Sequence, residues 1–181
     1  MNLKIIDDFY SPENFEYMMT SAMLSPYIST WQPYNLSSLS RANSYVCHET
    51  KSFTNSDKGL KLFIDTFQEK TGIIVEEFHT FFRKIYSKEL KNIFKYGTVP
   101  HQDDEKYNIA GVIHYNSSGL DDGTGLYSTN VQQVFRQIEP DVLIGARPNR
   151  CVFYDSQIWH RPLQDENNEM RIIQPFFLKT K

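Results

Sequence analysis

The sequence predicts a mainly β protein with helices packed against the outside of a sandwich or barrel. About eight short runs rich in β-branched and aromatic residues follow residue 73, turn-forming residues separate those runs, and two helical patterns precede them. Aromatic residues make up 14% of the 181-residue chain, with 13 Phe and 11 Tyr, and such residues favour strands. Hydrophobic residues reach 40%, so we expect one domain over residues 1–181 with its own core.

Two amphipathic helices are expected in the first part of the chain. Ser11 and Pro12 predict the start of the first, because serine caps a first turn and proline suits the first helical position. The second is expected over residues 57–70 and ends at Gly72, because glycine tolerates the left-handed conformation of a helix C-cap. The residues that form the two apolar faces are Phe15, Met18, Met19, Ala22 and Met23 in the first helix and Leu60, Phe63, Ile64 and Phe67 in the second.

The other segments before residue 73 are expected to lie over the core and its entrance. Residues 3–6 alternate weakly and predict an entry strand, and residues 42–50 predict another. Residues 25–40 are rich in Ser, Pro, Tyr and Asn, a composition typical of a long loop. We therefore treat residues 1–72 as a helical covering region with an entrance loop, in which Trp31 either closes over a site or packs the loop itself.

The β core is expected over residues 73–181. Its predicted strands are 73–75, 78–86, 93–99, 109–115, 125–128, 142–144, 151–154 and 171–178. Turn signals lie at residues 117–119, 122–123 and 147–149. Residues 76–90 are the ambiguous part of this assignment, because their charged residues also permit a helix.

Charge and composition argue against several classes of protein, including a dedicated nucleic-acid binder, although a catalytic domain that acts on nucleic acid stays open. The 19 Lys and Arg against 22 Asp and Glu leave a net charge of −3, so no basic excess is present to hold a nucleic-acid backbone. The first residues lack the pattern of a signal peptide, and no apolar run is long enough to span a membrane. Because Cys47 and Cys151 cannot form a disulfide scaffold, we expect a cytoplasmic protein without a membrane partner. The sequence is silent on the oligomeric state.

His101 and Asp103 are the first candidates for chemistry. They follow the predicted strand over residues 93–99, and residues i and i+2 of an extended chain point to the same face. One nitrogen and one oxygen donor therefore converge on one side, although a pair of this kind is common by chance and is also typical of an acidic surface turn. Asp104 is the alternative ligand, but its offset from His101 on a strand points it away.

His160 and Arg171 complete the set. His160 ends an apolar segment and is followed by a proline-containing turn, and two histidines with one carboxylate on one side of a metal suit non-haem Fe(II). Arg171 interrupts an apolar strand, which is unfavourable unless its guanidinium meets an anion. The fork of its donors matches a carboxylate, so Arg171 predicts an acidic small molecule or a structural acid partner.

With His101, Asp103, His160 and Arg171 in this order, the chain resembles the 2-oxoglutarate/Fe(II)-dependent oxygenase superfamily. The resemblance is to its prolyl 4-hydroxylase-like side, closest to small bacterial and phage-type members, and it covers roughly residues 78–178. Supporting segments are residues 109–116, similar to the strand after the metal motif, and residues 123–127, similar to a glycine-rich turn and strand. The resemblance implies a double-stranded β-helix, the jelly-roll or cupin-like barrel.

The same resemblance implies an activity. His101, Asp103 and His160 would hold Fe(II), and Arg171 would bind the distal carboxylate of 2-oxoglutarate. With O₂, such an enzyme hydroxylates an unactivated C–H bond and releases succinate and CO₂. A peptidyl residue, an amino acid or a small metabolite would be the substrate. Because halogenating relatives replace the carboxylate ligand with a small residue, Asp103 argues for hydroxylation or desaturation.

The chain departs from the superfamily on its last strand. The family often has Arg-x-Ser there, whereas Ile173 stands at the third position here. The missing hydroxyl contact to the cosubstrate would then come from elsewhere, and the candidates are Tyr96, Tyr115 and Thr98.

Two other functions remain open from the residues alone. One is a cupin-like protein that uses the barrel and a metal for isomerisation or ligand binding, and the other is a non-catalytic barrel in an assembly. Arg171 favours the oxygenase over the cupin-like protein. The intact set of ligand residues favours the oxygenase over the non-catalytic barrel. The remaining histidines, His48, His79 and His114, are expected to serve in packing.

Overall fold

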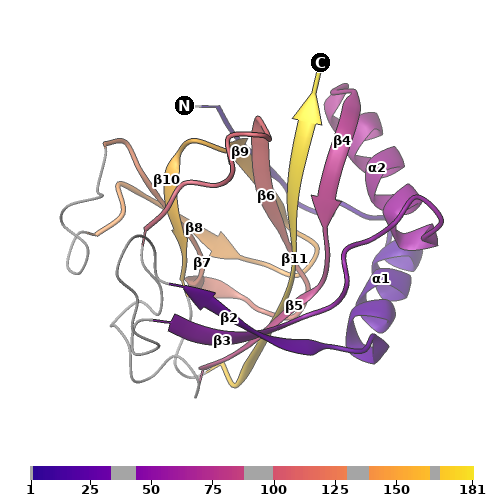
Figure 1. Cartoon of the computed structure of the whole chain (residues 1–181), viewed down its shortest axis with the longest axis horizontal. Coiled ribbons are helices and arrows are strands. Elements are labelled where there is room, and N and C mark those ends of the chain that lie inside the picture. Colours follow the sequence, from indigo (N-terminus) through magenta and orange to yellow (C-terminus); the bar gives the residue numbers. More distant parts are fainter. Residues whose placement is uncertain (1, 34–43, 88–99, 130–138, 164–167) are drawn as a thin grey trace.

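Two antiparallel sheets face each other, and two helices cover the outer face of the larger sheet (Figure 1). The computed structural model describes residues 2–33, 44–87, 100–129, 139–163 and 168–181. The strand predicted over residues 93–99 lies outside these residues. No helix within the described residues is long and apolar enough to cross a membrane.

The larger sheet has eight strands. They are β1 (Leu3–Ile6), β2 (Ile28–Pro33), β3 (Ser44–Glu49), β4 (Val75–Thr80), β5 (Arg83–Tyr86), β6 (Ile109–His114), β9 (Cys151–Asp155) and β11 (Met170–Thr180). Their order is β1-β9-β6-β11-β5-β3-β2, and β4 pairs with the far half of β11. The smaller sheet has the order β10-β7-β8, formed by β7 (Gly119–Tyr127), β8 (Val142–Ala146) and β10 (Trp159–Pro162).

The long strand β11 separates two cores, because successive side chains of a strand point to opposite faces. Ile172 and Phe176 belong to the core beneath the helices. Ile173, one residue further along, belongs to the core between the two sheets, and Phe177 packs against that core. Arg171 has the same parity as Ile173 and Phe177, so its side chain also points between the sheets.

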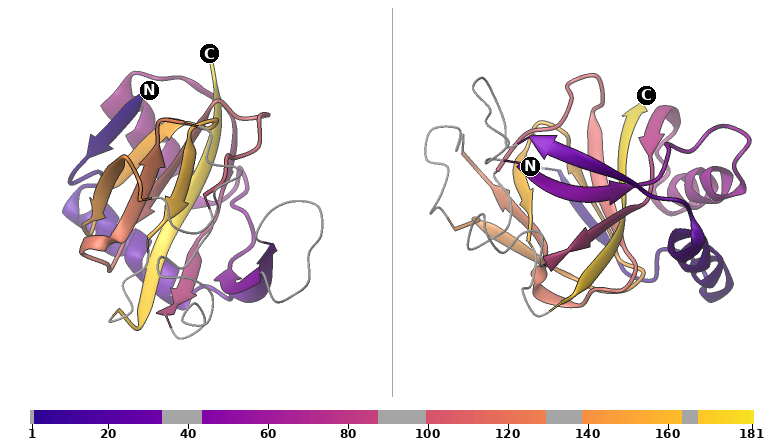
Figure 2. Two further views of the ribbon diagram at one scale, coloured as in Figure 1. Left: turned by 90° about the vertical axis from the view of Figure 1, so that its left-hand side faces the viewer. Right: turned by 60° about the horizontal axis from the view of Figure 1, so that its bottom comes forward.

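The helices form where the sequence predicts them. The first, α1 (Pro12–Leu24), has Ser11 as its N-cap, which accepts a hydrogen bond from the backbone N–H of Asn14 at 3.3 Å. The second, α2 (Lys58–Thr71), ends at Gly72 with φ of 71°. Both helices lie on the side of the molecule that carries β4 (Figure 2). Their buried apolar faces pack against the outer face of the sheet, whereas β1, β2 and β3 of the same region join the sheet itself.

Several strand predictions need correction. β2 lies inside the predicted loop over residues 25–40, and its pairing with β3 supplies the strand hydrogen bonds that its polar composition obscures. The predicted strand 78–86 is two strands, β4 and β5, interrupted at the buried residues Phe81 and Phe82. β10 was not predicted, because it holds only four residues and the last of them is Pro162.

The turn predicted at residues 122–123 is also wrong, and so is the glycine-rich turn of the family resemblance. Both segments lie within β7 (Gly119–Tyr127), whose pairing with β8 shifts in register between Gly119 and Thr124. A Cβ atom built on Gly123 would overlap the backbone carbonyl of Ile144 on β8. Glycine is therefore present here for the close approach of two strands and not for a turn.

We expect the Gly123→Ala substitution to lower the free energy of unfolding by about 3 kcal/mol, because the new methyl group meets backbone that cannot move cheaply. Gly59→Ala is the control, since a Cβ at Gly59 in α2 would make ordinary contacts with Met18 and Phe53. Alanine also favours the helix by about 0.5–1 kcal/mol. Urea unfolding of both variants measures the difference, and equal stability of the two would contradict the close β7–β8 approach.

Candidate metal centre

His101 and His160 are held side by side by their own backbones. The N–H of His101 donates to the carbonyl of His160 at 2.8 Å, and the N–H of His160 donates to the carbonyl of His101 at 2.9 Å. The centroids of the two imidazole rings are 4.4 Å apart. Segments that are distant in the sequence therefore bring two nitrogen donors to one place.

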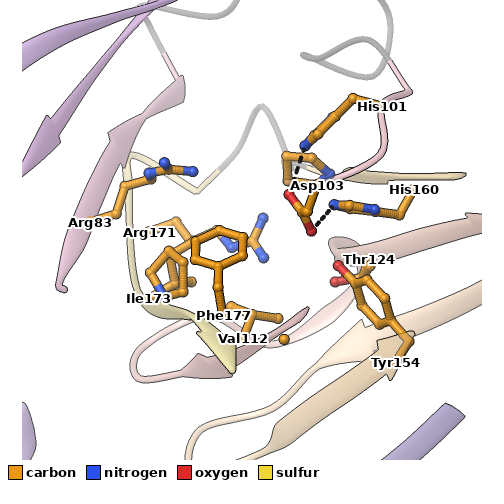
Figure 3. Close-up of a pocket in the computed structure, with 13 residues that line it drawn as sticks. Arg83, His101, Asp103, Val112, Thr124, Tyr154, His160, Arg171, Ile173 and Phe177 are labelled. Carbon is orange, nitrogen blue, oxygen red and sulfur yellow. Dashed lines mark ion pairs between the residues drawn. The ribbon is translucent and has the colours of Figure 1, made fainter. Parts of the chain in front are cut away.

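Asp103 completes the cluster. Its backbone N–H donates to the carbonyl of Ser156 at 3.1 Å, which anchors the segment after His101 to the turn before His160. Its carboxylate oxygens lie 3.4 Å from Nε2 of His160 and 3.9 Å from Nε2 of His101 (Figure 3). One ligand atom from each of the three residues lies within 4.8 Å of the others, which is a spacing that one metal ion can bridge. The structure thus brings together all three predicted ligands.

His160 is oriented as a metal ligand requires. Its Nδ1 lies 2.9 Å from the carbonyl oxygen of Ile158, so the proton sits on Nδ1 and the lone pair on Nε2. Nε2 is the atom that faces Asp103. Two imidazoles and one carboxylate also form the donor set that suits non-haem Fe(II) with open positions. The residues present therefore fit the predicted metal.

Asp104 does not join the cluster. Its carboxylate accepts the backbone N–H of Lys106 at 2.9 Å, and its side chain is exposed. The predicted choice of Asp103 over Asp104 agrees with this geometry.

Arg171 lies deep in the same pocket. Its side chain is 1% exposed, and its guanidinium donates to the carbonyl oxygens of Leu163 at 2.5 Å and Gly123 at 3.3 Å. The pocket is lined by Arg83, His101, Asp103, Gly111, Val112, Thr124, Tyr154, His160, Pro162, Arg171, Ile173, Pro175 and Phe177. The pocket therefore joins the three candidate ligands to a buried cation.

His114, which the sequence reasoning assigned to packing, lies beside Arg171. It is fully buried, and Nη2 of Arg171 lies 3.5 Å from its Nδ1. Burial, assisted by the charges of Arg171 and Arg150, lowers the pKa of His114 well below its usual 6.5. The imidazole is therefore neutral beside the guanidinium. Alternation along β6 was the signal that could have found it, because His114 shares its face with Ala110 and Val112 of the inner core.

The neutral state of His114 predicts a dependence of stability on pH. The pKa of His114 is lower in the folded protein than in the unfolded chain. Below about pH 6.5 the unfolded chain therefore binds a proton that the folded protein does not, and the free energy of unfolding falls as the pH falls. Between about pH 7.5 and 5.5 the unfolding free energy of the wild type should fall by about 1.4 kcal/mol more than that of His114→Gln. Urea unfolding at both pH values measures this, with His48→Gln as the control that keeps the wild-type slope. Equal slopes for wild type and His114→Gln would contradict the prediction.

The hydroxyl that was expected to replace the missing serine is not supplied by Tyr115. This side chain lies in the core beneath the helices, where its hydroxyl donates to Gln174 at 2.7 Å and its ring stacks on Phe15. The reason is strand parity, because Tyr115 follows His114 and so points to the other face. Tyr96 and Thr98 lie outside the described residues.

Two other hydroxyl residues line the pocket instead (Figure 3). Thr124 is on β7, and Tyr154 is on β9 with its ring 4.9 Å from the ring of His160. Burial raises the pKa of Tyr154 well above its usual value, and the charge of Asp103 acts in the same direction. Tyr154 therefore carries a neutral hydroxyl at the metal side of the pocket.

The two other histidines lie outside the cluster. Nδ1 of His48 is 3.1 Å from the hydroxyl of Ser29, and Nδ1 of His79 is 3.2 Å from the hydroxyl of Ser52. The ring of His79 also stacks on Phe177. The predicted packing role fits both. Trp31 lies on β2, opposite Val46 of β3.

Solved structures share this architecture at low sequence identity. The prolyl-4-hydroxylase of Pseudomonas putida is similar with a TM-score of 0.55 and 11% identity, over 99% of this chain and 92% of that chain. HygX of Streptomyces hygroscopicus, solved with nickel and 2-oxoglutarate, has a TM-score of 0.60 and 7% identity, over 98% and 82%. SnoN, a non-heme α-ketoglutarate-dependent epimerase of nogalamycin biosynthesis, has a TM-score of 0.62 and 8% identity, over 98% and 78%.

No protein-family model matches the chain, and no curated protein is detectably similar to it in sequence. The likeness to known proteins is therefore one of fold. It confirms the predicted resemblance at that level: the chain has the double-stranded β-helix fold of the 2-oxoglutarate/Fe(II)-dependent oxygenases.

Proposed function

We propose that this protein is an Fe(II)- and 2-oxoglutarate-dependent dioxygenase that hydroxylates an unactivated C–H bond. One observation carries the proposal: a His-Asp-His cluster and a buried arginine line a single pocket of this fold. The substrate is a small molecule or a peptidyl residue, and we place the enzyme in the cytoplasm, where Cys47 and Cys151 remain thiols.

His101, Asp103 and His160 would hold the iron and leave one side of it open to the pocket. When bound, iron and 2-oxoglutarate would supply, together with O₂, the oxidising power that acts on the substrate. Succinate and CO₂ would be the coproducts. His101 has the most exposed side chain of the three, at 38%, so the cluster lies at the pocket mouth.

Arg171 would bind the distal carboxylate of 2-oxoglutarate through its guanidinium fork. Because its position at the inner end of the pocket is fixed by two backbone carbonyls, it would also set which end of the cosubstrate faces the metal. Val112, Ile173 and Phe177 give the same pocket an apolar wall, and they would exclude water from the reacting groups.

Hydroxylation is a more specific proposal than membership of the oxygenase class. SnoN, which shares the fold, is an epimerase, so the fold alone supports the oxygenase class and not hydroxylation in particular. Hydroxylation or desaturation is favoured over halogenation by Asp103, whose carboxylate lies beside both histidines. The cupin-like alternative without 2-oxoglutarate is less well supported, because it gives no role to Arg171 in the same pocket.

Conversion of 2-oxoglutarate to succinate tests the proposal. We expect the Fe(II)-loaded protein in air to release succinate slowly without a substrate, and faster when a screened compound is the substrate. Asp103→Asn should abolish this release, whereas Asp104→Asn, a change of the adjacent exposed carboxylate, should leave it intact. No succinate from the wild type under any condition, or equal loss in the two variants, would refute the proposal.

A further inference from the structure

A second arginine reaches the pocket from the opposite wall. Arg83 lies on β5, where it shares its face with the buried Ile85 of the inner core, so alternation points it between the sheets. β5 pairs with β11 so that Arg83 is opposite Ile173 and Ile85 is opposite Arg171. Figure 3 shows the Arg83 side chain across the pocket from His101 and His160, with its guanidinium directed toward the pocket.

Glu49 holds this guanidinium in place. One of its carboxylate oxygens lies 2.7 Å from Nε and 2.5 Å from Nη2 of Arg83, and the two side chains are 15% and 17% exposed. The guanidinium also lies 5.3 Å from the ring centroid of Phe81. Glu49 thus fixes the orientation of the Arg83 guanidinium before any ligand enters. This reduces the conformational entropy that is lost when a ligand binds.

Glu49 and Arg83 face each other in the pairing of β3 with β5, and a cross-strand pair of opposite charges adds only about 0.2–1 kcal/mol to a sheet. The free energy needed to remove two charges from water is about as large as the free energy gained from their attraction. Well-packed apolar side chains at the same positions would therefore stabilise the fold equally well. Apolar side chains of the neighbouring strand β11, Ile173 and Phe177, already line this pocket. A preoriented cation in the wall of a reaction pocket is better explained by recognition of a ligand.

We propose that Arg83 binds a carboxylate of the substrate that is oxidised, so that the enzyme acts on an anionic molecule. This inference rests on the proposed function. The two ends of 2-oxoglutarate are already matched by the metal and Arg171, which leaves Arg83 for a second anion. Adjacent strands lie about 5 Å apart and two residues span about 7 Å, so the backbones of the two arginines are about 8 Å apart diagonally. Two separate anions can occupy such sites together.

Binding of simple carboxylates tests this inference without turnover. The Zn(II)-loaded protein is saturated with 2-oxoglutarate, and saturation-transfer NMR then measures binding of acetate, benzoate and N-benzoylglycine against the corresponding primary amides. We expect at least one carboxylate to bind at least ten times more tightly than its amide. The double variant Glu49→Gln with Arg83→Gln should lose that preference while leaving no buried charge without its partner.

Lys84→Gln is the matched control. It removes the same charge from the next residue of β5, whose ammonium lies outside the pocket, 3.2 Å from the carbonyl of Met23 and over the ring of Tyr27. This variant should bind the carboxylates as the wild type does. Calorimetric affinity for 2-oxoglutarate should change less than threefold in both variants.

Each other outcome overturns the inference. If no carboxylate binds the wild type, or amides bind equally well, the pocket does not select an anion. If the double variant keeps the preference, Arg83 does not carry it. If the double variant instead loses 2-oxoglutarate, Arg83 belongs to the cosubstrate site and the proposed function stands. If the wild type itself fails to bind 2-oxoglutarate, the proposed function fails, and this inference fails with it.

Discussion

The His160→Ala variant is expected to lose at least about 100-fold in affinity for Mn(II) or Fe(II), because one of the three clustered donors disappears. Only His101 and Asp103 of the cluster would then remain, with Nε2 of His101 3.9 Å from the nearest carboxylate oxygen of Asp103. Calorimetric titration with Mn(II) measures the affinity. Thermal unfolding gives a second readout, since a ligand that binds only the folded state raises the melting temperature.

The control for this experiment is His48→Ala, which removes an imidazole outside the cluster and should leave the metal affinity unchanged. His160→Ala should unfold in one transition that no longer responds to metal. A metal-dependent rise of its melting temperature equal to that of the wild type would show that the ion binds elsewhere.

Arg171→Gln is expected to weaken 2-oxoglutarate binding by about 100-fold or more, because the loss of one partner from a buried, hydrogen-bonded charge pair costs about 2–5 kcal/mol. The Mn(II) affinity should stay within threefold of the wild type, since Arg171 is not one of the three clustered donors. The two effects are separated by calorimetry, first with Mn(II) alone and then with 2-oxoglutarate added to the Mn(II)-loaded protein.

Arg171→Lys is the informative companion, because it keeps the charge and removes the guanidinium fork. It should fall between the wild type and Arg171→Gln in 2-oxoglutarate affinity. If Arg171→Gln binds 2-oxoglutarate as tightly as the wild type, the guanidinium has a purely structural role beside the carbonyls of Leu163 and Gly123.

Local signals in the sequence were enough for both helices and for most strands of the larger sheet. Ser11 and Gly72 act through backbone groups near them in the chain, so their roles can be read from the sequence. β2 and the first half of β7 depend on partners that are distant in the sequence. Gly123 was interpreted as a turn because its contact with Ile144 of β8 is set by strand pairing, which composition does not reveal.

The same distinction separates the parts of the site. His101 and Asp103 are two residues apart, and His160 and Arg171 interrupt apolar segments, so each was recognisable in the chain. The contact of His114 with Arg171 and the entry of Arg83 into the pocket depend on strand register, because β6 and β5 both flank β11. The pair of Arg83 with Glu49 likewise depends on the pairing of β3 with β5. Such long-range register is beyond the reach of local pattern analysis.

Addition of 2-oxoglutarate to the Fe(II)-loaded protein without O₂ tests the central claim most directly, because it requires the metal ligands and the cosubstrate site together. We predict a weak visible charge-transfer band that saturates with 2-oxoglutarate, disappears in His160→Ala and needs more 2-oxoglutarate in Arg171→Gln. A wild-type protein that binds Fe(II) but develops no such band, and forms no succinate when O₂ is admitted, would contradict the account.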